Sequence, residues 1–153
     1  MNLRRMGRYF HLRFLRMRSG PSEISRGLAI GVFCGMTPLL GLHMVLAVAL
    51  AMFLKGNKLM ALAGAWVGNP LTMPVFLILE YKLGRWIMGA SPAPVPQLSL
   101  GVGDVLKGSW KMMAPLFLGS LILGGAAALL TYAAAKPLVR ALKYHLKERR
   151  SAP

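Results

Sequence analysis

Three long stretches of the chain contain no Asp, Glu, Lys or Arg: residues 27–54, 59–79 and 112–135. The third stretch, as one helix rising about 1.5 Å per residue, is long enough to cross about 30 Å of hydrocarbon. Apolar residues recur with helical spacing or run continuously, and no alternating stretch typical of a strand is present. The sequence therefore predicts an all-α integral membrane protein.

The positive charges lie between and outside these stretches. The 153 residues include 19 Lys and Arg against 4 Asp and Glu, a formal net charge of +15. Such an excess indicates an anionic partner, either lipid head groups or nucleic acid. Nucleic-acid-binding proteins gather basic residues on one solvated face, whereas here the basic residues flank apolar runs. We therefore expect a single membrane domain over residues 1–153, with anionic lipids as partners and no nucleic acid.

Residues 1–20 have the pattern of a basic amphipathic helix. Apolar residues recur every three or four positions at Leu3, Met6, Phe10, Phe14 and Met17. The opposite side carries Arg4, Arg5, Arg8 and Arg16. This pattern predicts a helix in the head-group layer whose arginines bind lipid head groups. A solvated helix packed on the cytoplasmic end of the protein is the alternative.

Glycines spaced four residues apart mark two helix faces. The first face comprises Gly27, Gly31 and Gly35, and the second comprises Gly64 and Gly68. In lipid, a stripe without side chains allows a second helix to approach closely. Both faces are therefore predicted to be helix-packing surfaces.

Each glycine face is followed by a proline within an apolar run, Pro38 in the first and Pro70 in the second. Proline has no amide donor, and the backbone groups that a break frees at membrane depth must be covered by protein or water. The stretch 27–54 is either a kinked span or a re-entrant hairpin of two short helices, and we favour the hairpin. The second stretch repeats the first in outline, with an aromatic residue between glycines before the proline, and predicts a second broken hairpin.

The rest of the chain divides at its prolines. Residues 89–103 are predicted to form a Pro-rich loop and residues 104–136 to contain an unbroken transmembrane helix that Pro137 ends. Residues 137–153 would form a basic cytoplasmic tail, folded as an amphipathic helix with an apolar stripe at Leu138, Leu142 and Leu146. Lys and Arg crowd both ends of the chain and are absent from residues 89–104, so both termini are expected in the cytoplasm. Lys82 and Arg85 fit this topology less well and must reach toward the far surface.

Three segments resemble the bacterial family of domain of unknown function 2062. They are Gly-Val-Phe-Cys-Gly-Met-Thr-Pro-Leu-Leu-Gly-Leu-His at 31–43, Trp-Val-Gly-Asn-Pro-Leu-Thr-Met-Pro at 66–74 and Tyr-Lys-Leu-Gly at 81–84. The resemblance is close over residues 22–88, the family core. It implies a location in the bacterial inner membrane and no established activity. Relatives that join this domain to glycosyltransferases imply a link to envelope lipid chemistry.

Few polar residues lie in the apolar runs, and most of them adjoin the breaks. A ligand site or a structural break is predicted at Thr37, Pro38, Gly41, His43, Trp66, Asn69, Pro70, Thr72 and Pro74. A hydrogen-bonded core histidine and a proton carrier are both open for His43. Glu80 is expected to form an interfacial ion pair with Lys82 or Arg85.

The sequence contains no catalytic constellation, and we expect no enzyme activity, cofactor or metal. Cys34 is the single cysteine and is expected to be a small apolar core residue. Two functions stay open: a transporter or lipid-handling protein with a site where the breaks meet, perhaps as a homo-oligomer, and a non-catalytic scaffold for envelope-lipid or glycosyl-transfer enzymes. An enzyme acting on lipid-linked phosphate is the least favoured alternative.

Overall fold

The computed structural model describes residues 19–39, 41–89 and 110–151, and these residues contain helices and loops but no strand. The helices are α2 (Pro21–Gly35), α3 (Leu42–Phe53), α4 (Lys58–Ala65), α5 (Met73–Ile87) and α7 (Trp110–Ser151). The all-α prediction is confirmed. The surface helix predicted for the N-terminus and most of the predicted Pro-rich loop lie outside the described residues.

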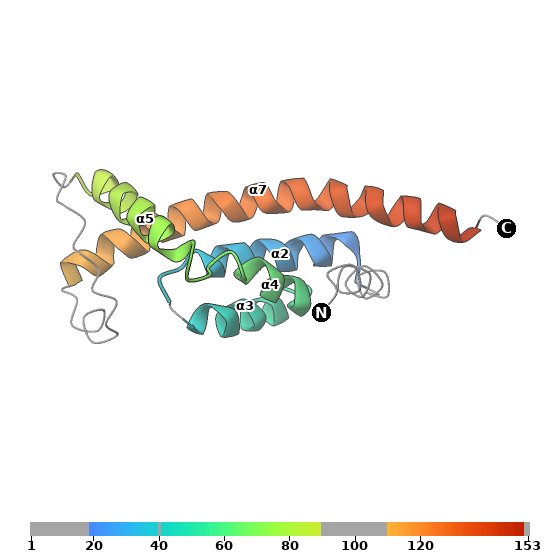
Figure 1. The fold of residues 1–153 in the computed structure, drawn as a ribbon, viewed down its shortest axis with the longest axis horizontal. Coiled ribbons are helices and arrows are strands. Elements are labelled where there is room, and N and C mark those ends of the chain that lie inside the picture. Colours follow the sequence, from blue (N-terminus) through green and yellow to red (C-terminus); the bar gives the residue numbers. More distant parts are fainter. Residues whose placement is uncertain (1–18, 40, 90–109, 152–153) are drawn as a thin grey trace.

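Helix α7 is 42 residues long and runs the length of the molecule (Figure 1). Its segment Met113–Tyr144 is long and apolar enough to cross a membrane by length and composition. The prediction that Pro137 ends this helix was wrong, because α7 continues to Ser151. Proline has a helical φ and removes one backbone hydrogen bond, and the good helix formers around it, such as Ala141 and Leu142, allow the helix to continue.

Helices α2 and α4 pack side by side through their glycine faces. A Cβ atom built on Gly31 would collide with the Ala61 carbonyl, and one on Gly64 would collide with the Leu28 carbonyl. Gly27 lies against Asn57 in the same way. The residue numbers of these paired positions increase in the same direction along both helices, so α2 and α4 are parallel. The two faces predicted from the glycine spacing are thus each other's partner.

Helix α3 runs back along α2 and α4, so the first break forms a hairpin (Figure 1). The three helices enclose a small core whose fully buried members are Cys34, Ala47, Ala51, Ala61 and Ala65. At the open end of the hairpin the Arg26 guanidinium donates to the Leu54 carbonyl at 2.8 Å. Small side chains in the core bring the three helix backbones close together.

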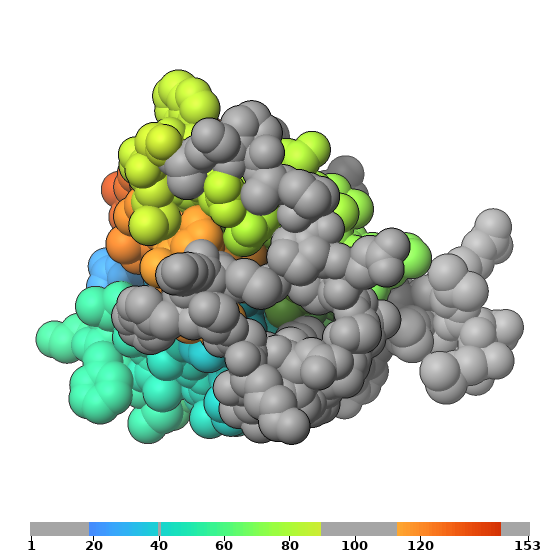
Figure 2. Space-filling model, turned by 90° about the vertical axis from the view of Figure 1, so that its left-hand side faces the viewer, coloured from blue at the N-terminus to red at the C-terminus, as the bar shows by residue number. Residues whose placement is uncertain are grey.

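The second break does not form a hairpin, so the prediction of two broken hairpins holds only for the first. Helix α5 leaves α4 and packs on α7 instead. Its backbone approaches α7 at two glycines, where Gly84 meets the Pro115 carbonyl and Gly119 meets the Glu80 carbonyl. These contacts give α5 a closer partner than α4. Helices α5 and α3 consequently lie on opposite sides of the molecule, with α7 between them (Figure 2).

Candidate functional site at the paired helix breaks

The two helix breaks begin side by side. Helix α2 ends at Gly35 and α4 ends at Ala65, and a Cβ atom on Gly35 would lie 3.2 Å from both the Ala65 Cα and the Gly68 nitrogen. The glycine contacts between α2 and α4 therefore continue up to the residues just before Pro38 and Pro70. In space, the structure brings together the starts of the two breaks that the sequence suggested as one site.

The polar side chains of the breaks are bonded within their own turns. The Thr37 hydroxyl donates to the Cys34 carbonyl at 2.6 Å. The Asn69 side-chain oxygen accepts from the Leu71 and Thr72 amides at 2.9 and 3.1 Å. The Thr72 hydroxyl donates back to the Val67 carbonyl and to the Asn69 carbonyl. These bonds satisfy backbone groups that the interrupted helices leave free, and they fix the shape of each turn.

Three other predicted site residues lie on the outer side of the second break. Trp66 is 68% exposed and points away from the core, and Pro70 is also exposed. Pro74 occupies the first turn of α5, where the missing amide costs no helical hydrogen bond. These three residues do not converge on an enclosed space. Pro38, in contrast, is buried in the first break.

Gly41 and His43 begin the returning helix α3. Gly41 has a φ of +81°, which favours glycine, and is exposed to the surroundings. His43 is 6% exposed and shares a face of α3 with Ala47 and Ala51. Its Nδ1 lies 3.2 Å from the Leu39 carbonyl oxygen, whereas its buried Nε2 has no hydrogen-bond partner within the described segments. His43 is thus a core histidine with one polar atom unsatisfied.

The position of the breaks along the long axis of the molecule can be measured against helix α7. Gly124 lies against the end of α2, with a built Cβ atom 3.4 Å from the Phe33 carbonyl and 3.5 Å from the Met36 Cβ. Counted along α7, Gly124 is about 20 Å from Lys111 and about 18 Å from Lys136, the charged residues that flank its apolar part. The breaks therefore lie near the middle of this apolar length.

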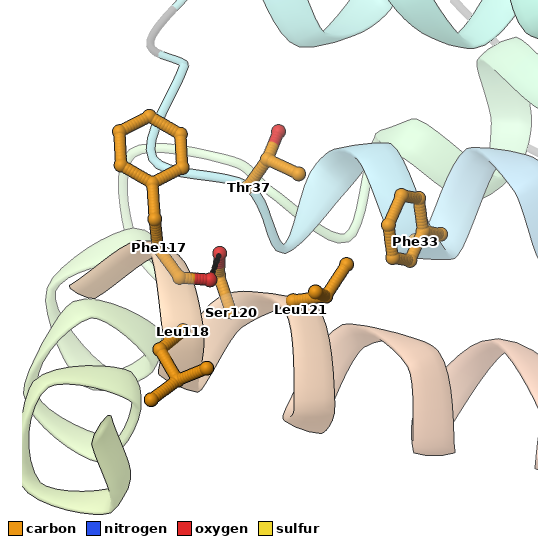
Figure 3. Close-up of a pocket in the computed structure, with 6 residues that line it drawn as sticks. All are labelled: Phe33, Thr37, Phe117, Leu118, Ser120 and Leu121. Atoms are coloured by element: carbon orange, nitrogen blue, oxygen red, sulfur yellow. Dashed lines mark hydrogen bonds between the residues drawn. The ribbon is translucent and has the colours of Figure 1, made fainter. Parts of the chain in front are cut away.

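An open groove lies beside the first break, between the end of α2 and α7 (Figure 3). Its volume is about 340 Å³, near the lower end of the range for ligand pockets. The groove is lined by Phe33, Thr37, Phe117, Leu118, Ser120 and Leu121. Its two hydroxyls are both used internally, because Ser120 donates to the Phe117 carbonyl at 2.9 Å and Thr37 to that of Cys34. The groove consequently presents aromatic and aliphatic surface.

Glu80 is buried, although its neighbours in the sequence predicted an ion pair at the membrane interface. Its side chain is fully buried at the α5–α7 crossing, and neither carboxyl oxygen has a hydrogen-bond partner. The predicted ion pair was wrong, because neither Glu80 oxygen has a partner among the described residues. The Arg85 guanidinium lies 5.8 Å from the Tyr81 ring centre and donates to its hydroxyl at 3.4 Å. Lys82 is exposed. Glu80 and Gly84 are four residues apart and so lie on the same face of α5. This spacing was the feature of the sequence that could have predicted close packing of that face on another helix.

Within the described residues, no group of three His, Cys, Asp or Glu side chains is arranged to hold a metal ion. A family model described as "Uncharacterized protein conserved in bacteria (DUF2062)" matches residues 4–148. Neither a curated protein nor a solved structure matches the chain.

Proposed function

Since the chain belongs to the family of domain of unknown function 2062, as its motifs predicted, we propose that it is a bacterial inner-membrane protein that binds lipid beside its paired helix breaks. The observation that carries this proposal is the apolar groove next to the first break, near the middle of the apolar length of α7.

The distribution of large and small side chains supports a lipid environment. Large apolar side chains point outward, including Phe53 at 83% and Leu129 at 73% exposure. Among the fully buried side chains of the described residues, Ile24 is the one large aliphatic group. Soluble proteins bury such groups because water is their surroundings. In a bilayer, lipid covers the large groups and small residues mediate helix packing.

Charged residues support a defined placement in the membrane. Arg26, Lys55 and Lys58 lie together at the open end of the α2–α3 hairpin, about 15 Å along α2 from its broken end. Lys136 lies at a similar distance from the breaks along α7. Basic residues at this end favour the cytoplasmic side. In this placement α2, α3 and α4 enter halfway from the cytoplasm, and α5 and α7 reach the other surface.

The groove suits an acyl chain better than a polar solute. A solute-binding site needs a few polar groups that are free to orient the ligand. Here both groove hydroxyls donate to backbone carbonyls. In the second break the Asn69 side-chain oxygen accepts from the Thr72 amide and the Thr72 hydroxyl donates to the Val67 carbonyl, so both are used within their own turn. We therefore favour lipid handling over transport of a small solute. Enzyme activity is not part of the proposal.

The exposed backbone at Gly41 favours a second copy of the chain as a partner. Glycine has no side chain, so its exposure is exposure of backbone atoms, and irregular backbone facing lipid is strongly disfavoured. A copy related by a two-fold axis along the membrane normal brings the same residue to the same depth. Homo-oligomerisation is thus part of the proposal. The same contact would suit the alternative function, a membrane scaffold whose breaks are purely structural turns.

The N-terminal arginines extend the proposal to anionic lipid. Replacing Arg4, Arg5 and Arg8 with Gln in a peptide of residues 1–18 should weaken its binding to anionic vesicles, because each basic residue contributes about 1 kcal/mol near such a surface. Equal binding of both peptides would remove the electrostatic part of the proposal. Binding of the unmodified peptide to neutral vesicles is the control.

A photoactivatable phospholipid tests the groove directly. The protein in native-like bilayers should be labelled by a probe with its reactive group near the middle of an acyl chain, at α7 residues around Leu121. Leu121→Trp fills the groove and should lower this labelling several-fold. Leu129→Trp, the same change at an exposed site on the same helix, should leave it unchanged. Equal labelling of both variants would favour the scaffold.

A further inference from the structure

The contact between α5 and α7 contains a carboxyl group that lipid binding does not use. Glu80 is 0% exposed, and both of its oxygens lack partners among the residues that the structure describes. Its backbone touches Gly119, which lies about 12 Å along α7 from Lys111 and so within the apolar length of that helix. An ionisable side chain at such a depth points to a function by default, because burying it has a cost that packing alone does not explain.

The groups around Glu80 in the described part of the chain leave its charge without compensation. Helix α7 has no charged residue between Lys111 and Lys136. On α5, Lys82 is exposed and Arg85 is bonded to Tyr81. Ser120, next to Gly119 on α7, donates its hydroxyl to the Phe117 carbonyl. No described side chain therefore neutralises an ionised Glu80.

From this arrangement we propose that the Glu80 carboxyl is a proton-binding site within the membrane. A metal cation needs several ligands, and no group of three His, Cys, Asp or Glu side chains among the described residues is arranged to supply them. A proton needs only the carboxyl itself. The carboxylate takes one proton from hydronium: one O–H bond forms on the carboxyl, one O–H bond of hydronium breaks, and a water molecule is released. The inference goes beyond the lipid groove and does not depend on it.

The place of Glu80 in the contact between α5 and α7 links its protonation to the packing of α5. Helix α5 is joined to α4 through the second break and packs on α7 rather than on α4. The neutral acid is compatible with the dry crossing between Glu80 and Gly119. The carboxylate favours water, so loss of the proton favours separation of α5 from α7. Proton binding thereby sets how firmly α5 docks.

Carbodiimide labelling tests the proposal, because dicyclohexylcarbodiimide reacts with protonated carboxyls in apolar surroundings. The full chain in native membranes is treated across a pH series, and the labelled residue is located by mass spectrometry. We expect label on Glu80, with a rate that falls about tenfold per pH unit once the carboxylate predominates. Glu23, exposed in the first turn of α2, should stay unlabelled, and Glu80→Gln should abolish the label.

Three results would overturn the proposal. The first is the absence of label on Glu80 in protein whose buried Cys34 stays protected from thiol reagents, which shows an intact fold. The second is a labelling rate that does not change between about pH 5 and about pH 10. The third is protection by added sodium ions at constant pH, which would assign the site to a cation. Each of these readouts is separate from lipid labelling at Leu121, so the two proposals can fail independently.

Discussion

Replacing Gly31 with Ala should separate α2 from α4. The new Cβ atom would collide with the Ala61 carbonyl and would lie 2.8 Å from both the Ala65 nitrogen and the Gly64 Cα, whereas ordinary contacts are 3.4–4 Å. These neighbours are backbone atoms and cannot rotate away, so the helices must move apart by at least about 0.6 Å. A gap of that size forfeits roughly a quarter to a half of the dispersion energy of the atoms involved.

We expect Gly31→Ala to lower the free energy of unfolding by about 2 kcal/mol, in the range for overpacked cores. For a chain of this size the melting temperature should fall by about 4–8 °C. Cys34 supplies the assay, because it is the single cysteine and is fully buried between α2, α3 and α4. A maleimide dye that fluoresces on reaction then reports the opening of this core as detergent-solubilised protein is heated.

Gly125→Ala is the matched control. A Cβ atom at Gly125 would have no neighbour within 4 Å, and alanine is the better helix former by about 0.5–1 kcal/mol. This variant should melt at or slightly above the temperature of the parent protein. If Gly31→Ala melts together with the parent, or if Gly125→Ala loses as much stability, the close backbone packing of α2 and α4 is refuted.

Three further predictions concern the breaks and the topology. Asn69→Ala should cost about 1–2 kcal/mol in the same melting assay, because the Leu71 amide loses its acceptor and the Thr72 amide keeps only the Asn69 backbone carbonyl. Leu129→Ala at an exposed position should change stability by less than about 0.5 kcal/mol, and equal effects would contradict the bonded turn. The topology is tested with single-cysteine variants in which Cys34 is replaced by Ala. A membrane-impermeant maleimide should label the Lys58→Cys variant from inside the cell and the Ser99→Cys variant from outside. Labelling of the Ser99→Cys variant from inside alone would reverse the proposed topology. In the same background Leu71→Cys, 86% exposed at the second break, should cross-link to a second copy in membranes while Leu129→Cys should not, and cross-linking of neither would argue against a dimer that covers the breaks.

Local sequence signals predicted the parts of the fold that depend on neighbouring residues. Prolines within apolar runs marked where α2 and α4 end, and glycines at four-residue spacing marked the faces that pack. Both signals act through the backbone, since proline removes a donor and glycine removes a side chain. The all-helical class followed from the same hydrophobic pattern.

The parts of the fold that the sequence did not predict depend on contacts between segments that are distant in the chain. The course of α5 is set by Gly84 and Gly119, which belong to helices separated by residues 88–109. The burial of Glu80 follows from that crossing, and its neighbours Lys82 and Arg85 in the sequence gave the opposite signal. The continuation of α7 past Pro137 depends on the helix formers on both sides outweighing one lost hydrogen bond. A pattern within one segment carries little information on these points.

The small residues in the core affect the heat-capacity change that accompanies separation of the helices. Water-soluble proteins unfold with a large positive heat-capacity change because large apolar groups become hydrated. Here Cys34, Ala47, Ala51 and Ala61 fill the core, and the large side chains already lie at the surface, where lipid would surround them in both states. Separation of the helices within a bilayer should therefore show a small heat-capacity change. The stability of α2, α3 and α4 should vary weakly with temperature, without the marked curvature that leads to cold denaturation.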